Sequence, residues 1–248
     1  MSFLGYLQPH WPVPNTVKAF TTTRKMQQTP PRGYEYFNLA THVGDTLAHV
    51  QYHRQQLQQE LALPEMPTWL NQVHSNHVIE LGNTTHPIEP KADASFTKAK
   101  NTVCAILTAD CLPLLIYDPE QQQVAAVHGG WRGLHAGIIA NTLQALHTTP
   151  SSLFVWLGPA ISGENYEVGD EIYNSFTQQD KQFSLAFRKH GNRWRLDLYQ
   201  IAILQLQQCG VAKIFHEPFC TYRQKDLFYS YRRDGQCTGR MATLIYQR

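Results

Sequence analysis

The segment Thr108–Gly133 constrains the fold more than any other part of the chain, because its pattern predicts a β-hairpin. Leu112–Tyr117 and Val124–Val127 are apolar and rich in Leu, Ile and Val, as buried strands are. Between them an Asp-Pro pair is followed by glutamines, which is typical of a turn. We expect a four-residue loop, Asp118–Gln121, to join the two strands.

This register brings a thiol and an imidazole together at the open end of the hairpin, since it pairs Cys111 with His128. Directly opposed residues of antiparallel strands have Cβ atoms ~4.5–5.5 Å apart on the same face of the sheet. A loop one or two residues different would leave Cys111 and His128 as diagonal neighbours, which are still close. Such a pair suits either a metal ion or a nucleophile with its base, and the hairpin alone leaves both open.

The rest of the chain predicts an α+β fold, because strand-like and helix-like segments mix without a strict alternation. The strands expected outside the hairpin are Val17–Thr23, Met66–Leu70, His77–Leu81, Thr102–Leu107, Leu153–Leu157, Ala212–His216 and Met241–Tyr246. The expected helices are Thr46–Leu61, capped by Asp45, and Leu134–Leu146, Asp170–Gln178 and Leu196–Gln208. We expect a single domain over residues 1–248, with two mixed β-sheets and outer helices.

Composition excludes several classes of protein. The chain has 248 residues, 42% of them hydrophobic, which is enough for one substantial core. Basic residues exceed acidic ones by only two and form no run, which argues against nucleic-acid binding. No segment approaches the roughly 18–20 apolar residues of a membrane span, and the N-terminus lacks the features of a signal peptide. These two absences favour a cytoplasmic protein, which we expect to be a monomer. The five cysteines are an odd number with no CxxC pair, which argues against a disulfide framework in a reducing compartment.

His74, in NQVHSNHV, is a third candidate beside Cys111 and His128, since it lies in a polar cluster just after a predicted strand. Taken singly, each of the three is more often a buried thiol or a hydrogen-bonded histidine, and their spacing matches no short zinc motif. Together they supply three zinc ligands and leave a fourth position for water or substrate, as in catalytic sites. We therefore expect Zn²⁺ as the cofactor, with Cu²⁺ as a second possibility because copper tolerates these ligands.

The turn that follows His128 favours an anion site. In HGGWRG the chain passes from a predicted strand into a helix, whose first backbone amides point at an anion. The glycines allow close approach, and Arg132 is suited to a bidentate grip on phosphate or carboxylate. The alternative is a tight turn with a surface arginine, but its position next to His128 favours the anion site.

The segment Phe228–Met241, FYSYRRDGQCTGRM, leaves two interpretations equally open. It carries arginines and tyrosines suited to binding phosphate and stacking on a base or sugar: Arg232, Arg233, Arg240, Tyr229 and Tyr231. Its Asp-Gly pair is instead a strong turn signal, which predicts a solvent-exposed hairpin.

Two further groups carry less weight. His49 and His53 are spaced like a metal pair on a helix, but HVQYH lacks the glutamate of metalloprotease helices, so we expect a solvated helix face. Glu164 and Glu167 are available as a catalytic acid or base, although an isolated glutamate is more often a surface residue.

The ordered motifs of the chain resemble the YfiH-type family, also called the laccase-domain or multicopper polyphenol oxidase family. More recent names for its members are purine nucleoside phosphorylase and peptidoglycan editing factor. The motifs that carry the resemblance span nearly the whole chain: FTTTR, FNLATHVGD, QVHS, ADASFT, TADCLPLLIYD, AVHGGWRGL, LGPAISGENYEVG and FYSYRRDGQCTGR.

The resemblance implies a site, a fold and an activity. It implies that His74, Cys111 and His128 are metal ligands and that Arg24, Asn38, Arg132 and Arg240 line the substrate site. The implied fold is an α+β arrangement with two β-sheets, similar to Cys-His toxin deamidases. The implied chemistry is phosphorolysis of adenosine, inosine and methylthioadenosine to base and sugar 1-phosphate, with adenosine deamination, so the expected partners are purine nucleosides and phosphate. The family commonly carries asparagine at the position of His53.

Three other functions remain as alternatives. A multicopper oxidase holds several coppers with His-x-His pairs, and the sequence contains none, so polyphenol oxidation is expected only as a side activity of a copper-loaded site. A metal-free hydrolase or amidase that edits cell-wall precursors would use Cys111 as nucleophile and His128 as base. A binding protein that senses a nucleotide or a metal would need neither reaction.

Overall fold

The computed structural model describes residues 5–25, 37–82 and 88–248. Its helices are α1 (Leu47–Glu60), α2 (Trp131–His135), α3 (Ile138–Leu146), α4 (Asp170–Gln179), α5 (Leu198–Gln208) and α6 (Tyr231–Asp234). Short 3₁₀ turns cover Pro150–Ser152, Gly163–Asn165 and Lys181–Ala186. In this part of the chain, no helix is long and apolar enough to cross a lipid bilayer.

The strands of the described residues form three sheets. A six-stranded mixed sheet has the order β12 (Lys213–His216), β8 (Phe154–Leu157), β6 (Leu112–Asp118), β7 (Gln123–Gly129), β4 (Ala94–Thr97) and β3 (Val78–Glu80). A four-stranded antiparallel sheet has the order β1 (Tyr6–Leu7), β2 (Val17–Thr22), β13 (Met241–Gln247) and β5 (Cys104–Thr108). A small antiparallel sheet joins β10 (Phe187–His190), β11 (Arg193–Leu196) and β9 (Glu167–Val168).

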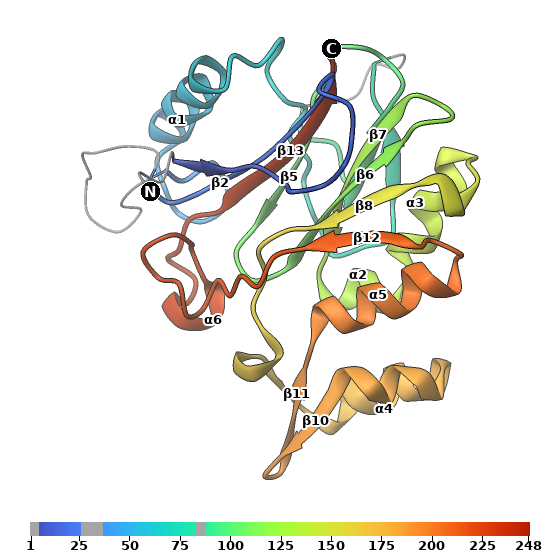
Figure 1. The fold of residues 1–248 in the computed structure, drawn as a ribbon. Coiled ribbons are helices and arrows are strands. Elements are labelled where there is room, and N and C mark those ends of the chain that lie inside the picture. Colours follow the sequence, from blue (N-terminus) through green and yellow to red (C-terminus); the bar gives the residue numbers. More distant parts are fainter. Residues whose placement is uncertain (1–4, 26–36, 83–87) are drawn as a thin grey trace.

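The two larger sheets pack face to face between layers of helix (Figure 1). Along β6, Leu114 and Ile116 join the core under α3 and α5, while the alternate residue Leu115 joins the core shared with β2, β5 and β13. On the far side of the four-stranded sheet, Leu244 of β13 shares a third core with Leu57 of α1. The α+β class with mixed sheets and outer helices is confirmed, and the sheet of β9, β10 and β11 is an addition to the two that we expected.

The predicted hairpin forms, but its register differs by two residues from the expected one. Pro113 pairs with His128, and the turn lies between Asp118 and Gln123, because Asp118 stays in the strand. One oxygen of its buried carboxylate accepts the backbone N–H groups of Glu120 and Gln121, and the other accepts the side-chain amide of Gln123. Since side chains alternate with period two, a shift of two residues keeps every side chain on its face of the sheet.

Other predicted elements needed correction at their ends. The expected helix Leu134–Leu146 starts earlier and is split in two by Gly137, which has φ +86°. Met66–Leu70 is not a strand, because only an isolated bridge from Thr68 pairs it with its neighbour. The expected cap Asp45 is replaced by Thr46, whose side chain accepts the backbone N–H of His49.

Candidate metal centre

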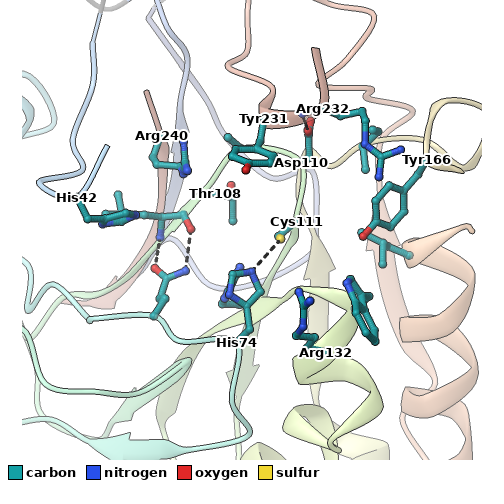
Figure 2. Close-up of a pocket in the computed structure, with 17 residues that line it drawn as sticks. His42, His74, Thr108, Asp110, Cys111, Arg132, Tyr166, Tyr231, Arg232 and Arg240 are labelled. Atoms are coloured by element: carbon teal, nitrogen blue, oxygen red, sulfur yellow. Dashed lines mark hydrogen bonds between the residues drawn. The ribbon is translucent and has the colours of Figure 1, made fainter. Parts of the chain in front are cut away.

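Three side chains from separate segments meet at the open end of the β6–β7 hairpin (Figure 2). His74 lies in the loop before β3, Cys111 precedes β6, and His128 is on β7. Each offers a ligand atom, and these atoms all lie within 4.8 Å of one another. Sγ of Cys111 is 3.8 Å from Nε2 of His74, whose ring centroid is 4.8 Å from that of His128. The shifted register therefore still brings Cys111 and His128 together, as diagonal neighbours.

A buried carboxylate holds two of these three residues in place. Asp93, directly before β4, is fully buried and accepts a 2.8 Å hydrogen bond from Nδ1 of His128. Its oxygens also accept the backbone N–H of His74 at 3.0 Å and of Ser75 at 2.7 Å, together with the Ser75 hydroxyl. His74 has φ +60°, an unfavourable conformation that these hydrogen bonds to its loop help to hold. Asp93 was not predicted, and the signal for it was an acidic residue at the start of an apolar strand.

The electrostatics of the cluster favour a thiolate next to a charged imidazole. Burial acts to raise the pKa of Cys111, but the charge of His128 and hydrogen bonds to both histidines outweigh it and lower the pKa to about 6. Burial acts to lower the pKa of His128, but the Cys111 thiolate and Asp93 outweigh it and raise the pKa to about 9. For Asp93 the bond to His128 outweighs the effect of burial, and its pKa falls to about 2.

The donor set fits zinc. A thiolate and two imidazoles are borderline-soft ligands, and the bond from Nδ1 of His128 to Asp93 leaves Nε2 as the atom that would bind a metal in place of its proton. Room for the donors depends on Gly130, since a Cβ there would lie 2.8 Å from Cδ2 of His74 and 3.2 Å from Sγ of Cys111. This spacing explains why the sequence has glycine beside the cluster.

The cluster opens into a cavity of about 460 Å³, which is within the usual range for small-molecule sites. Figure 2 shows Cys111 with His74 and Arg132 on one side and with Tyr231, Arg232 and Arg240 on the other. The cavity is lined by residues from both large sheets and from the segments between them: His42, Gln72, His74, Leu107, Thr108, Ala109, Asp110, Cys111, His128, Trp131, Arg132, Ile161, Tyr166, Leu198, Tyr231, Arg232 and Arg240. It thus combines three side chains able to bind a metal with three arginines and two tyrosines.

Asp110, which precedes Cys111 in the chain, holds the segment around α6 that forms one wall of the cavity. It has φ +93°, and its buried carboxylate accepts hydrogen bonds from the hydroxyls of Thr221 and Ser230 and from the backbone N–H of Arg232. Ser230 also caps α6, so of the two interpretations left open for this segment the exposed hairpin does not form, and a short helix takes its place. The wall presents Tyr231 to the cavity, next to Arg232.

Several candidate residues lie away from this cavity. Arg24 borders a separate cavity of about 290 Å³, and its guanidinium lies over the ring of Tyr229. Asn38 is buried, and its Oδ1 accepts the backbone N–H of Arg240, so it contacts a cavity residue without lining the cavity. The roles of Arg24 and Asn38 in substrate binding remain predictions.

The two glutamates and the remaining arginine of the candidate set are held by other groups. Glu164 pairs with Arg188 and Arg195. Glu167 pairs with His190. Arg233 donates to the backbone carbonyls of Thr221, Tyr222 and Phe228. These contacts give each residue a structural role outside the cavity.

Comparisons with known proteins cover nearly the whole chain. The family described as multi-copper polyphenol oxidoreductase laccase matches residues 18–248. The chain is 43% identical over 239 residues to the purine nucleoside phosphorylase YfiH of Shigella flexneri, covering 96% of this chain and 97% of that protein. It is 39% identical over 245 residues to a purine nucleoside phosphorylase of Haemophilus influenzae, with 97% and 98% covered.

Solved structures share the fold. The Neisseria meningitidis protein NMB0706 superposes with a TM-score of 0.90 at 40% identity, over 98% of this chain and 99% of that one. YlmD from Geobacillus stearothermophilus superposes with a TM-score of 0.91 at 28% identity, over 100% and 98%.

Proposed function

The chain belongs to the multi-copper polyphenol oxidoreductase laccase family, and we propose that it is a metal-dependent purine nucleoside phosphorylase. The observation that carries the proposal is that three side chains able to bind a metal open into a cavity lined by three arginines. The relatives named purine nucleoside phosphorylase support it, because they align over almost their whole length.

The proposed substrates are adenosine, inosine or methylthioadenosine, together with phosphate. A phosphate oxygen forms a bond to C1′ of the sugar, the bond from C1′ to the purine nitrogen breaks, and the base leaves with the electron pair and takes up a proton. Arg132, Arg232 and Arg240 provide the positive charge that phosphate needs. Tyr166 and Tyr231 offer rings on which a purine base stacks.

His74, Cys111 and His128 would hold the metal, while Asp93 orients the ring of His128 and holds the backbone of His74. Bound zinc would supply a Lewis acid that polarises an oxygen or activates a water at the open side of the site. The water-activating property also suits deamination of adenosine, in which water adds at C6 and ammonia leaves, so we propose this as a second activity. Copper in the same site is the source we propose for any polyphenol oxidation, since one site of this kind lacks the several coppers of an oxidase.

A second function, hydrolysis of an amide, is favoured by one specific observation. Cys111, His128 and Asp93 are arranged in space as a nucleophile, a base and a carboxylate that orients the base. The pKa of the Cys111 thiol is also lowered to about 6. This arrangement would act without a metal, because a thiolate bound to zinc is a poor nucleophile. Metal content therefore separates the two functions.

The test is base release from inosine and adenosine, with and without phosphate, by protein of measured metal content. The proposal predicts phosphate-dependent release that is lost together with the metal in Cys111→Ser. Cys237→Ser is the matched control, because Cys237 is exposed and lies outside the cavity, so wild-type activity is expected. Metal-free protein that hydrolyses an amide and is inactivated by alkylation of Cys111 would overturn the proposal in favour of the hydrolase.

A further inference from the structure

A second group of metal-ligand side chains lies at the start of α1, away from the cavity. Asp45, His49 and His53 each offer a ligand atom, and these atoms lie within 4.8 Å of one another. The spacing of four residues places them on one side of the helix. None of the three lines the cavity of the candidate metal centre.

The expectation of a solvated helix face is wrong for this group. His53 is only 1% exposed, and the side chain of Asp45 is 5% exposed. His49 is half-buried, and its ring centroid lies 4.1 Å from that of His53. His53 is buried because it lies with Val50 and Leu57 on the inner face of α1.

His53 is oriented as metal-binding histidines are. Its Nδ1–H donates a 2.8 Å hydrogen bond to the backbone carbonyl of Asn38, which leaves the lone pair on Nε2. Metal-ligating histidines typically donate their other ring N–H to a carbonyl or carboxylate in this way. The geometry therefore leaves Nε2 of His53 as the atom that can bind a metal.

Asp45 supplies negative charge that no strong cation balances. Its oxygens accept from the side-chain amide of Asn38, the backbone N–H of Thr46 and Nδ1 of His49. Among the described residues, Asp45 makes no ion pair with a lysine or arginine. A nearly buried carboxylate beside two imidazoles is thus a site that gains from a divalent cation.

We propose that Asp45, His49 and His53 form a second metal site that takes Zn²⁺. Two imidazole nitrogens and one carboxylate oxygen are a donor set that zinc uses in proteins. The site is structural, because its donors come from one helix and its flanking residue and it lies outside the cavity. Its existence does not depend on whether the proposed phosphorylase reaction is correct.

The cation at this site would stiffen one wall of the cavity through Asn38. The side-chain amide of Asn38 donates to Asp45 and its backbone carbonyl accepts from His53, while its Oδ1 accepts the backbone N–H of Arg240. Arg240 lines the cavity, so the contacts form a continuous path from the second site to the first.

Metal stoichiometry tests the proposal directly. Untagged full-length protein is stripped with a chelator and titrated with Co²⁺ as a spectroscopic substitute for zinc. A cobalt ion bound by Cys111 gives a thiolate-to-metal charge-transfer band, whereas the Asp-His-His site gives only weaker ligand-field bands. We expect two ions per chain in the wild type, one without the charge-transfer band in Cys111→Ser, and one with that band in His49→Ala.

Two further variants make the result decisive. His53→Asn keeps a donor near the Asn38 carbonyl while removing the imidazole lone pair, so it is also expected to bind one ion fewer than the wild type. His10→Ala is the control for surface histidines, since its side chain is 90% exposed, and it is expected to bind two. Folded His49→Ala and His53→Asn that still bind as many ions as the wild type would overturn the second site. Loss of the charge-transfer ion alone in Cys111→Ser concerns only the first centre, so the two proposals fail separately.

Discussion

The two donor clusters contain similar side chains but occupy different settings. His74, Cys111 and His128 come from three distant segments and open into a cavity that Arg132 helps to line. The cluster of Asp45, His49 and His53 comes from one helix end and lies outside that cavity. The difference teaches that two histidines beside a cysteine or an aspartate do not by themselves make a reaction centre. Each cluster supplies three protein donors, so the cavity for substrate is what distinguishes the first cluster from the second.

The largest effect is expected from Asp93→Asn, which keeps the size of the side chain but removes its charge. The change leaves backbone N–H groups facing an amide and breaks a buried ion pair, which costs about 3–5 kcal/mol. Metal affinity of the first centre should fall about 10–100-fold, as for other residues that orient ligands. Cobalt titration and thermal unfolding measure both effects, while the second site should bind as before.

Asp118→Asn is the matched control for Asp93→Asn, because Asp118 is equally buried and lies at the closed end of the hairpin. It should lower stability without changing metal affinity. Equal losses of metal affinity in both variants would show that Asp93 acts through general stability rather than by orienting His74 and His128.

Gly130→Ala should weaken the first centre by crowding it. The added Cβ would lie 2.8 Å from His74 and 3.2 Å from Cys111, and such overpacking costs about 1–3 kcal/mol, so metal affinity should fall about tenfold. Gly137→Ala provides the contrast, since nothing lies within 4 Å of its Cβ but its φ is +86°. That variant should lose about 1–2 kcal/mol of stability and keep its metal affinity, and the opposite result would refute the crowding explanation.

Arg132→Ala tests phosphate binding in the cavity separately from metal binding, because Arg132 lines the cavity and is not a candidate metal ligand. Loss of a charged hydrogen-bond donor to phosphate corresponds to about 1.5–3 kcal/mol, so KM for phosphate should rise at least about tenfold with metal content unchanged. Arg188→Ala is the control, since Arg188 is exposed and pairs with Glu164. An unchanged KM for phosphate in Arg132→Ala would contradict the proposal that Arg132 binds phosphate in the cavity.

The smallest effect is expected from Asp110→Asn, which loosens the wall that carries α6. Two hydroxyls and the backbone N–H of Arg232 would then face an amide in place of a carboxylate. We expect this change to lower the free energy of unfolding by about 1–2 kcal/mol. KM for inosine should rise severalfold, because Tyr231 and Arg232 become less well placed. Steady-state kinetics with metal-replete protein measure this change, and a loss of bound metal instead of a rise in KM would contradict it.

The sequence predicted the central elements of this fold well because strong local signals specify them. Apolar runs identified both strands of the β6–β7 hairpin, although Asp118, which is both a strand residue and a turn acceptor, shifted the register by two. Side-chain alternation made this error harmless for Cys111 and His128. Gly137 split the expected helix because one positive φ ends the regular hydrogen bonding.

Contacts between distant segments were beyond prediction from local patterns. Asp93 acquires its role only when β4 pairs with β7 and brings it to His128. Likewise, the segment after Phe228 contains a turn signal, but the buried carboxylate of Asp110 binds Ser230 and Arg232 and draws the segment into a helix over the cavity. His53 was misjudged because its burial depends on packing against Phe37, a contact that helix periodicity does not reveal.

The most direct test of the central claim follows sugar 1-phosphate rather than the free base. Metal-free protein is incubated with inosine and phosphate, before and after zinc is added, and ribose 1-phosphate and hypoxanthine are quantified. A metal-dependent phosphorylase should form neither product before zinc and equal amounts of both afterwards. Full turnover by the metal-free protein, or hypoxanthine released with free ribose in place of ribose 1-phosphate, would contradict it.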